Sequence, residues 1–510
     1  MRLSSLSVRL RSPSECGAAP LGRAGAPAPA VLAKNQARRT GQAGQGAGRG
    51  PGGPPHILLL LLLTCTLASA EQVDWIYTAR YVLPMDGRAD PIENGAVAVR
   101  GERIVAVGPR AEIDRQYQAK QRVDRPEALI LPGLINTHTH AAMSLLRGIA
   151  DDLRLQDWLQ NYIFPAEKKN VKADFVLWGT RLACLEMMLS GTTTFVDMYY
   201  FEDKVAEATR EAGMRGVLGE TVIGFPDPDS PTPADALILT EAFIKRFQHD
   251  SLIVPAVAPH AIYTNDDATL RKSSLLARRY NVPLLIHVGE TKKEDDDARA
   301  TRGMSPTRLL EALGVLDGRV VAAHGVWLDA ADMQILKKHN VGVAHCPSSN
   351  MKLASGVAPV LKLLGLGIAV GLGTDGPAGS NNDFDLMEEM NLASNLQKIT
   401  TMDPTALPAR QAIEMATILG ARVIGMDKEI GSLEPGKRAD LITIRLDRPH
   451  AVPLYNVWSQ VVYALKGSDV ADVMVNGRQI VRDGRSLTLD PAVVLPKARE
   501  YAAQVKASLR

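Results

Sequence analysis

Two closely spaced histidines suggest metal chemistry near one quarter of the way along the chain. The stretch LPGLINTHTH, Leu131 to His140, places them in alternation at the end of an apolar run. In a β-strand, residues i and i+2 point to the same side, so His138 and His140 would share one face. Each buried imidazole nitrogen there needs a partner, and a metal ion would satisfy both rings.

Residues of the same kind follow later apolar segments. His260 ends LIVPAVAPH, His287 and Glu290 lie in PLLIHVGE, His324 follows VVAA, and Asp375 ends IAVGLGTD. A lone histidine at such a place is more often a hydrogen-bonded structural residue, and an aspartate after GLGT could cap a helix. Because so many of them follow strands of one predicted sheet, the pattern favours a metal site.

The elements that must position these residues form a repeating pattern of strands and helices. Between about Leu131 and Met426, eight short apolar segments alternate with amphipathic stretches such as DDATLRKSSLLARRYN. This alternation predicts a parallel sheet, and eight units predict a (β/α)₈ TIM-type barrel over residues 131–426. Active sites of such barrels lie at the C-terminal ends of the strands, where these residues fall. We assign no role to His345, which lies within the seventh segment.

Two β-rich parts flank the predicted barrel. Residues 73–130 and 427–490 contain alternating apolar segments, and the second part includes an Asn476-Gly477 hairpin signal. We expect the two parts to pack together as a small composite β-sandwich domain. A C-terminal helix is expected over residues 491–510.

Residues 1–70 are predicted to lie outside this fold as a disordered leader with a signal peptide. The segment up to Pro55 is rich in Gly, Ala, Pro and Arg, and HILLLLLLTCTLASAEQ then joins a short apolar run to a small-x-small cleavage pattern. We expect export to the periplasm or the extracellular space if residues 56–70 act as a signal, with no stable membrane insertion after processing. Otherwise the protein would be cytoplasmic. An uncleaved anchor or a wrongly assigned start is the alternative.

The composition narrows the classes of partner. The 510 residues are 46% hydrophobic and 22% charged, as in an ordinary globular protein. A formal net charge of +2 gives no general attraction to nucleic acid. The four cysteines form no C-x-x-C pair, which argues against a disulfide framework or a thiolate zinc site. We expect a small-molecule substrate, no nucleic-acid partner and a homo-oligomer.

Three histidines and one aspartate suit a single divalent metal ion. We predict that His138, His140, His287 and Asp375 bind Zn²⁺, and Fe²⁺ or Mn²⁺ would also fit. A second ion would need a bridging group, and no lysine lies between Val205 and Ile244. A divalent ion lowers the pKa of its bound water, so that hydroxide is available near neutral pH.

The remaining polar residues suggest how such a site would act. Glu290, three residues after His287, could pass a proton to a leaving group. His324 could hold or polarise the hydroxide, and Asp375 could take the proton of the attacking water. These roles predict metal-assisted hydrolysis of a C–N bond at a trigonal carbon.

Several stretches resemble the amidohydrolase superfamily, and more narrowly the 5-methylthioadenosine/S-adenosylhomocysteine deaminases and their triazine-hydrolase relatives. They are PGLINTHTHAAMSLLRGIADDLRLQDWLQNYIFPAE, APHAIYT, IHVGET, AAHGVWL, HCPSSNMKLASGVAPV and GLGTDGPAGSNN, and the resemblance covers about Val73 to Arg485. It implies a hydrolytic deaminase of a purine nucleoside: 5-methylthioadenosine, S-adenosylhomocysteine or adenosine. The alternative is a hydrolase of another amino- or chloro-substituted heterocycle of the s-triazine, guanine or cytosine type.

The resemblance also implies roles for individual residues. It supports the four metal ligands named above, proton transfer by Glu290 and assistance by His324. By the same resemblance, Glu167 would hold the ribose hydroxyls and His260 would contact the nucleoside. Trp158 would line the pocket, although a tryptophan of the core is the alternative.

One stretch departs from the pattern of the relatives. Those that accept S-adenosylhomocysteine carry arginines after the third barrel strand, whereas GETVIGFPDPDSPTPADAL has Glu220 near the first of these positions and no arginine through Leu237. An acid there would repel a carboxylate. We therefore expect a substrate with an uncharged tail, such as methylthioadenosine or adenosine, or another aminated ring.

Overall fold

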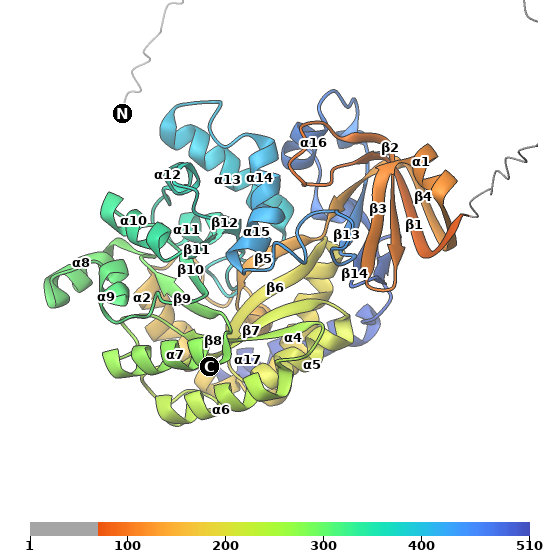
Figure 1. Cartoon of the computed structure of the whole chain (residues 1–510). Coiled ribbons are helices and arrows are strands. Elements are labelled where there is room, and N and C mark those ends of the chain that lie inside the picture. The colour runs from red at the N-terminus through yellow and green to blue at the C-terminus, as the bar shows by residue number, and fades with distance from the viewer. Residues whose placement is uncertain (1–69, 510) are drawn as a thin grey trace, which may run out of the picture. The chain divides into compact units, whose positions relative to one another are not determined.

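The structure, a computed structural model, describes residues 70–509 (Figure 1). The leader and signal peptide predicted for residues 1–70 therefore lie outside the described residues, apart from Ala70. Among the described residues, no helix combines the length and the apolar character needed to span a bilayer.

The predicted (β/α)₈ barrel is confirmed as a closed ring of eight strands. Every strand pairs in parallel with its neighbours, and the ring closes where Leu372 faces Asn136. In chain order the strands are β5 (Leu134–Thr139), β6 (Thr192–Tyr199), β7 (Arg215–Val222), β8 (Ile253–Pro259), β9 (Leu284–Val288), β10 (Val320–His324), β11 (Gly342–His345) and β12 (Val370–Leu372).

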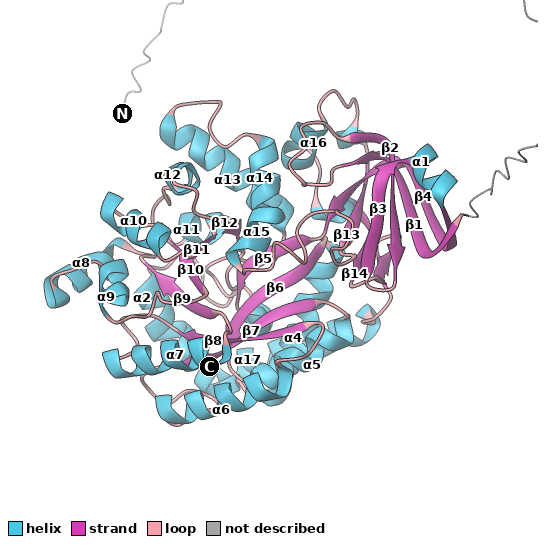
Figure 2. Ribbon diagram, viewed as in Figure 1, coloured by secondary structure: helices cyan, strands magenta, loops and turns pink. Residues whose placement is uncertain are grey.

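Helices surround this barrel (Figure 2). Several begin at a residue whose side chain accepts a backbone N–H of the first turn, as Asp266 does from Thr269, because the first N–H groups of a helix lack partners within it. The helices that follow the strands are α4 (Ala173–Leu189), α5 (Glu202–Ala212), α6 (Pro233–Phe247), α7 (Asp267–Tyr280), α8 (Lys292–Arg302), α9 (Pro306–Ala312), α10 (Ala330–Lys338), α11 (Pro347–Lys352), α12 (Val360–Gly365), α13 (Leu386–Thr401), α14 (Ala409–Ala416) and α15 (Ile418–Val423).

An irregular segment between β5 and α4 lies over the C-terminal ends of the strands. It consists of η1 (Ala141–Leu146), α2 (Leu155–Trp158), the π-helical turn η2 (Leu159–Ile163) and α3 (Phe164–Asn170). Most of its apolar side chains are buried, although the segment belongs to no regular strand–helix unit. It forms one wall of the pocket described below.

The predicted composite domain is also confirmed. Its strands form one eight-stranded sheet in the order β16-β15-β14-β13-β4-β1-β2-β3, in which only the β1–β4 pair is parallel. The sheet curls so that Ile104 donates its N–H to Lys437 O at 2.9 Å, and a buried apolar core fills its concave side. The strands are β1 (Glu71–Val82), β2 (Ile92–Arg100), β3 (Arg103–Pro109), β4 (Tyr117–Pro132), β13 (Leu441–Arg445), β14 (Val470–Val475), β15 (Arg478–Arg482) and β16 (Arg485–Ser486).

Four short helices and the long C-terminal helix α17 complete the composite domain and the C-terminal region. The C-terminal helix packs on the barrel helices, where Tyr501 meets Phe175 edge to face with ring centroids 5.6 Å apart. The elements are α1 (Arg110–Gln116), η3 (Pro449–Ala451), α16 (Val457–Tyr463), η4 (Gly467–Asp469) and α17 (Pro491–Ser508).

Two features join the composite sheet to the barrel. β4 passes into β5 through Gly133, where a Cβ atom would lie only 2.1 Å from the Thr193 hydroxyl oxygen, so only glycine fits. At the start of β7, the buried Arg215 guanidinium pairs with the buried Asp440 carboxylate beside β13. The position of the first histidine pair is therefore tied to the composite sheet.

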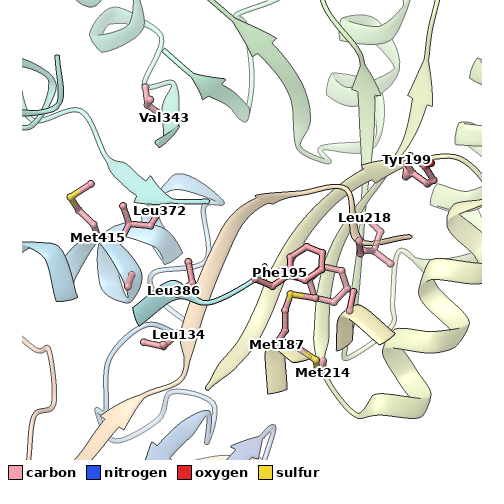
Figure 3. Close-up of a cluster of buried hydrophobic side chains, with 14 of the residues drawn as sticks. Leu134, Met187, Phe195, Tyr199, Met214, Leu218, Val343, Leu372, Leu386 and Met415 are labelled. Atoms are coloured by element: carbon pink, nitrogen blue, oxygen red, sulfur yellow. The ribbon is translucent and has the colours of Figure 1, made fainter. Parts of the chain in front are cut away.

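The barrel and its helices share a continuous apolar core. Figure 3 shows Phe195 of β6 and Leu218 of β7 packed with Met187 of α4 and with Met214. All four side chains are fully buried. This packing fixes the strands whose ends carry the polar residues.

Candidate active site

One pocket lies at the C-terminal ends of the barrel strands, as the barrel prediction implies. Its walls differ in character. One wall is polar, and the irregular segment between β5 and α4 supplies an apolar wall opposite. The polar wall consists of His140, His260, His287, Glu290, His324 and Asp375, and the apolar wall of Met143, Leu155, Trp158, Leu159, Ile163 and Phe164.

His138 lies at the centre of the histidine cluster beneath the pocket. Its ring centroid is 4.9 Å from that of His140, 5.0 Å from His287 and 5.4 Å from His324. Candidate ligand atoms lie within 4.8 Å of one another in two groups that share this residue, one with His287 and His324 and one with His140 and Asp375. His138 Nε2 is buried without a hydrogen-bond partner, which is unfavourable unless a ligand completes the site. The donor set therefore fits a divalent metal ion.

Backbone contacts aim two of the rings at the cluster. His140 Nδ1 lies 2.7 Å from Met198 O, and His287 Nδ1 lies 2.8 Å from His260 O. An imidazole that donates its Nδ1–H to a carbonyl presents the lone pair of Nε2 on its other side. This orientation is the one that a metal ligand requires.

The electrostatics of the cluster favour neutral imidazoles at most positions. Burial lowers the pKa of His138 to about 4 and that of His260 to about 3, and it holds the pKa of His287 well below its usual value. Burial also lowers the pKa of His140, but the hydrogen bond to Asp375, the negative charges of Asp375 and Asp197 and the contact with Met198 O together outweigh this and raise the pKa to about 9. Neutral imidazole and ionised carboxylate are the forms that bind metals, and a bound cation would replace the proton between His140 and Asp375.

Two of the polar residues have an unusual backbone. His324 has φ +71° and Asp375 has φ +64°, in the left-handed region that non-glycine residues rarely adopt. Such conformations persist where the surroundings hold them in place, and they concentrate at functional sites.

Glu290 lies next to His324 on the polar wall. It is 3% exposed, and one of its oxygens is 3.9 Å from His324 Nε2. Burial raises the pKa of Glu290 to about 8, so the carboxyl group holds a proton near neutral pH. Its backbone N–H and that of Gly289 donate to the Glu294 carboxylate at 2.8 and 3.1 Å.

Glu167, from α3, occupies a different part of the pocket. The Tyr199 hydroxyl donates to Glu167 Oε1 at 2.6 Å, and both side chains are buried. Burial raises the pKa of Glu167 to about 7, although the hydrogen bond from Tyr199 partly offsets this. The pocket thus has a second acceptor group away from the histidine cluster.

Comparison with known proteins identifies the family. The sequence pattern of the Amidohydrolase family matches residues 129–480, and that of an imidazolonepropionase-like composite domain of bacteria matches residues 95–117. The chain belongs to the amidohydrolase family.

Relatives of this amidohydrolase cover nearly its whole described length. A protein of Syntrophus aciditrophicus named 5-methylthioadenosine/S-adenosylhomocysteine deaminase 1 is 46% identical over 86% of this chain and 99% of the relative. A protein of Thermodesulfovibrio yellowstonii named 5-methylthioadenosine/S-adenosylhomocysteine deaminase is 44% identical over 85% of this chain and 99% of the relative.

Solved structures share the fold of this amidohydrolase. An adenosine deaminase from Xanthomonas campestris with bound zinc superposes with a TM-score of 0.84 at 37% identity, over 86% of this chain and 100% of the other. Atrazine chlorohydrolase TrzN from Arthrobacter aurescens, complexed with zinc, gives 0.77 at 24% identity, over 84% of this chain and 100% of the other. The second likeness shows the fold alone.

The structure brings every site residue predicted for this amidohydrolase to one place. His138 lies beneath the pocket, and the others line it. Trp158 is both a pocket residue and a residue of the core. It lines the pocket, but its side chain is 95% buried and donates its Nε1–H to Ala378 O at 3.0 Å. His345 is fully buried outside the pocket lining.

The placement expected for Glu220 was wrong. Successive residues of a strand point to opposite faces, and in β7 it is Thr221 that faces the pocket. Glu220 points away, accepts the Glu202 N–H at 3.1 Å and lines a separate hollow with Asp229. Its charge therefore gives no reason to exclude a carboxylate-bearing substrate.

Sequence reasoning missed the residues that support the site. Tyr199 contacts Glu167, Glu294 holds the backbone at Glu290, Ser349 contacts Asp375 and Asn350 contacts His324. Ser349 and Asn350 lie in the HCPSSNMKL stretch, which carried the family resemblance without an assigned role. Neither the Tyr199-Tyr200 pair nor the Ser348-Ser349-Asn350 stretch forms a sequence motif that would indicate contact with the site.

Proposed function

We propose that this amidohydrolase is a metal-dependent hydrolytic deaminase that releases ammonia from the purine ring of a nucleoside, such as 5-methylthioadenosine or adenosine. The observation that carries the proposal is the arrangement of one pocket. Its polar wall holds the metal-ligand set and Glu290, and another part of it holds the hydrogen-bonded pair Glu167–Tyr199. Such a pocket suits a base joined to a hydroxylated sugar. The names of relatives 46% and 44% identical agree with this assignment.

The proposed cofactor is one divalent ion held by His138, His140, His287 and Asp375. When bound, such an ion activates water as a nucleophile. Zn²⁺ is the first candidate, because imidazole and carboxylate suit it and because the Xanthomonas campestris structure contains zinc. Fe²⁺ and Mn²⁺ suit the same donors.

The proposed proton transfers use two side chains, and a third orients the water. Asp375 accepts the proton that the attacking water loses as it adds to the ring carbon bearing the amino group. Glu290, protonated near neutral pH, donates to the adjacent ring nitrogen and thereby makes that carbon electrophilic. As the adduct collapses, Asp375 passes its proton to the amino group, which leaves as ammonia, and the hydroxyl proton of the adduct returns to Glu290 as the C=O bond forms. His324 Nε2, 3.9 Å from Glu290, orients the attacking water.

The pocket lining also suggests which sugar substituents are accepted. Among its residues there is no lysine or arginine, and the wall opposite the histidines is apolar. An uncharged 5′ substituent could pack on that wall, whereas the carboxylate of a homocysteine tail would find no cation in the lining. We therefore propose methylthioadenosine or adenosine ahead of S-adenosylhomocysteine.

The test is ammonia release by the purified, zinc-loaded protein. The panel contains methylthioadenosine, adenosine, S-adenosylhomocysteine, guanine, cytosine and an amino-triazine. We expect ammonia from methylthioadenosine or adenosine, and a loss of at least about 10²-fold in kcat for Glu290→Gln, because Gln cannot transfer the proton. Activity confined to guanine, cytosine or the triazine would contradict the nucleoside assignment and support the alternative heterocycle.

A further inference from the structure

The first turn of the helix α11 (Pro347–Lys352), which follows β11, lies between two residues of the proposed machinery. In the barrel β11 is flanked by β10 and β12. His324 ends β10, and Asp375 follows β12. This first turn of α11 therefore reaches one of these residues on each side.

Ser349, in this turn, contacts Asp375. The Ser349 hydroxyl donates to Asp375 Oδ2 at 2.7 Å, and the serine is fully buried. This bond leaves Asp375 Oδ1 facing His138 Nε2 at 3.5 Å and His140 Nε2 at 3.3 Å. The Gly376 N–H also donates to Oδ1, at 2.6 Å, so Ser349 and this backbone group together fix which carboxylate oxygen faces the proposed metal ligands.

Asn350, the next residue, contacts His324. Its Oδ1 lies 3.0 Å from His324 Nδ1, and its side chain is 1% exposed. An Nδ1–H donated to this oxygen leaves the lone pair of Nε2 facing Glu290 and the pocket. Asn350 thus determines which ring nitrogen of His324 meets the substrate and the attacking water.

Both supported residues need external support more than most. His324 and Asp375 have left-handed backbones, which cost free energy in non-glycine residues. Such a backbone persists only where neighbouring groups hold it in place. The adjacent Ser349 and Asn350 supply those contacts from a single turn.

We propose that Ser349 and Asn350 are positioning residues with separate tasks: Ser349 orients the metal ligand Asp375, and Asn350 orients His324, which does not bind the metal. The inference rests on the proposed function, because it uses the ligand set assigned there. It adds a division of labour within the turn. Removing one contact should impair metal binding, and removing the other should impair only the chemical step.

The test compares single substitutions in the full-length protein. Zinc affinity is measured by competition with a chromophoric chelator, and kcat and KM are measured on the best nucleoside of the panel. Ser349→Ala should weaken zinc binding about 10- to 100-fold, the usual effect of losing a contact behind a metal ligand, and Ser349→Thr should restore most of it. Asn350→Ala should leave zinc affinity within about threefold of the parent but lower kcat about tenfold or more at unchanged KM.

Ser348 offers a matched control within the same turn. Its backbone N–H and its side chain both bond to the Glu389 carboxyl group, and alanine keeps the backbone contact; neither His324 nor Asp375 takes part. Ser348→Ala should therefore retain zinc affinity and kcat. Equal zinc affinities for Ser349→Ala and Ser348→Ala would overturn the proposal, and so would a loss of zinc binding in Asn350→Ala.

The two proposals can fail separately. Zinc competition requires no substrate, so it tests the task of Ser349 and the unchanged zinc affinity expected of Asn350→Ala even if no nucleoside is deaminated. Absence of turnover on the whole panel, with the expected zinc affinities, would reject the nucleoside substrate alone. Normal deamination with equal zinc affinities in the turn variants would reject only the tasks assigned to Ser349 and Asn350.

Discussion

At the scale of single residues, the pKa of Glu167 lies near neutral pH, so its proposed contact with the sugar hydroxyls should depend on pH. Burial raises the pKa of Glu167 to about 7. Its carboxylate form, which predominates above that pH, is the better acceptor for sugar hydroxyls. We therefore predict that KM for the nucleoside falls as the pH rises through about 7. Initial rates over a range of pH and substrate concentration provide the measurement.

Two variants sharpen this prediction. The hydrogen bond from Tyr199 lowers the pKa of Glu167, so Tyr199→Phe should move the midpoint of the KM profile to higher pH. Glu167→Gln should abolish the midpoint and raise KM about tenfold or more, since a hydrogen bond to a charged group is worth ~1.5–3 kcal/mol. A midpoint that persists in Glu167→Gln would assign the titration to another group.

The site residues that were predicted from the sequence have a signal in the neighbouring residues of the chain, whereas those that were missed depend on contacts between distant parts of the chain. His138, His140, His287 and Asp375 lie at the C-terminal ends of apolar strands or just after them, so their positions could be inferred from the strand pattern. Ser349 contacts a residue 26 positions away, and that contact depends on the left-handed backbone of Asp375, which no local pattern reveals. The sequence also does not reveal which face of the sheet each strand residue points to, because an error of one residue in register reverses the assignment.

That error explains the wrong placement of Glu220. The strand that contains GETV was predicted correctly. The sequence alone does not say whether Glu220 or Thr221 faces the pocket. Only the hydrogen-bonded register with β6 and β8 fixes this choice. The prediction of the closed barrel, in contrast, rested on the number of strands. That number does not change when the predicted boundaries of each strand are wrong by several residues.

At the scale of elements, the start of α8 holds the loop that carries Glu290. Glu294, in the first turn of α8, accepts the N–H groups of Gly289 and Glu290, and Gly289 has φ +58°. Glu294→Ala would leave two N–H groups in a buried loop without partners. We predict a lower melting temperature and a fall of about 10²-fold in kcat, because small displacements of a proton donor are costly.

A neighbouring residue provides the control for this prediction. Lys293, on the exposed side of the same helix, pairs only with Asp297 across one turn. Lys293→Ala should leave kcat unchanged. Equal kcat values for Glu294→Ala and Lys293→Ala would show that the loop keeps Glu290 in place without this contact.

At the scale of the whole molecule, the composite sheet and the barrel depend on each other through a buried ion pair. Arg215 at the start of β7 and Asp440 beside β13 are 1% and 4% exposed, and the Asn476 N–H also donates to Asp440 at 2.7 Å. Removing one partner leaves an uncompensated buried charge, which costs ~3–5 kcal/mol. We predict that Arg215→Met lowers the free energy of unfolding by about this amount, as measured by chemical denaturation.

Replacing both partners should cost less than replacing one. In Arg215→Met combined with Asp440→Leu no charge remains buried, so stability should recover much of the loss. The exposed pair Lys497–Glu500 on α17 offers a control, because its removal in Lys497→Ala uncovers no buried charge. A double variant as unstable as Arg215→Met would mean that the pair contributes through its shape and hydrogen bonds. The first two proposed metal ligands, His138 and His140, lie at the end of β5, which continues from β4 through Gly133. Loosening of the composite sheet should therefore also weaken zinc binding in Arg215→Met but not in the double variant.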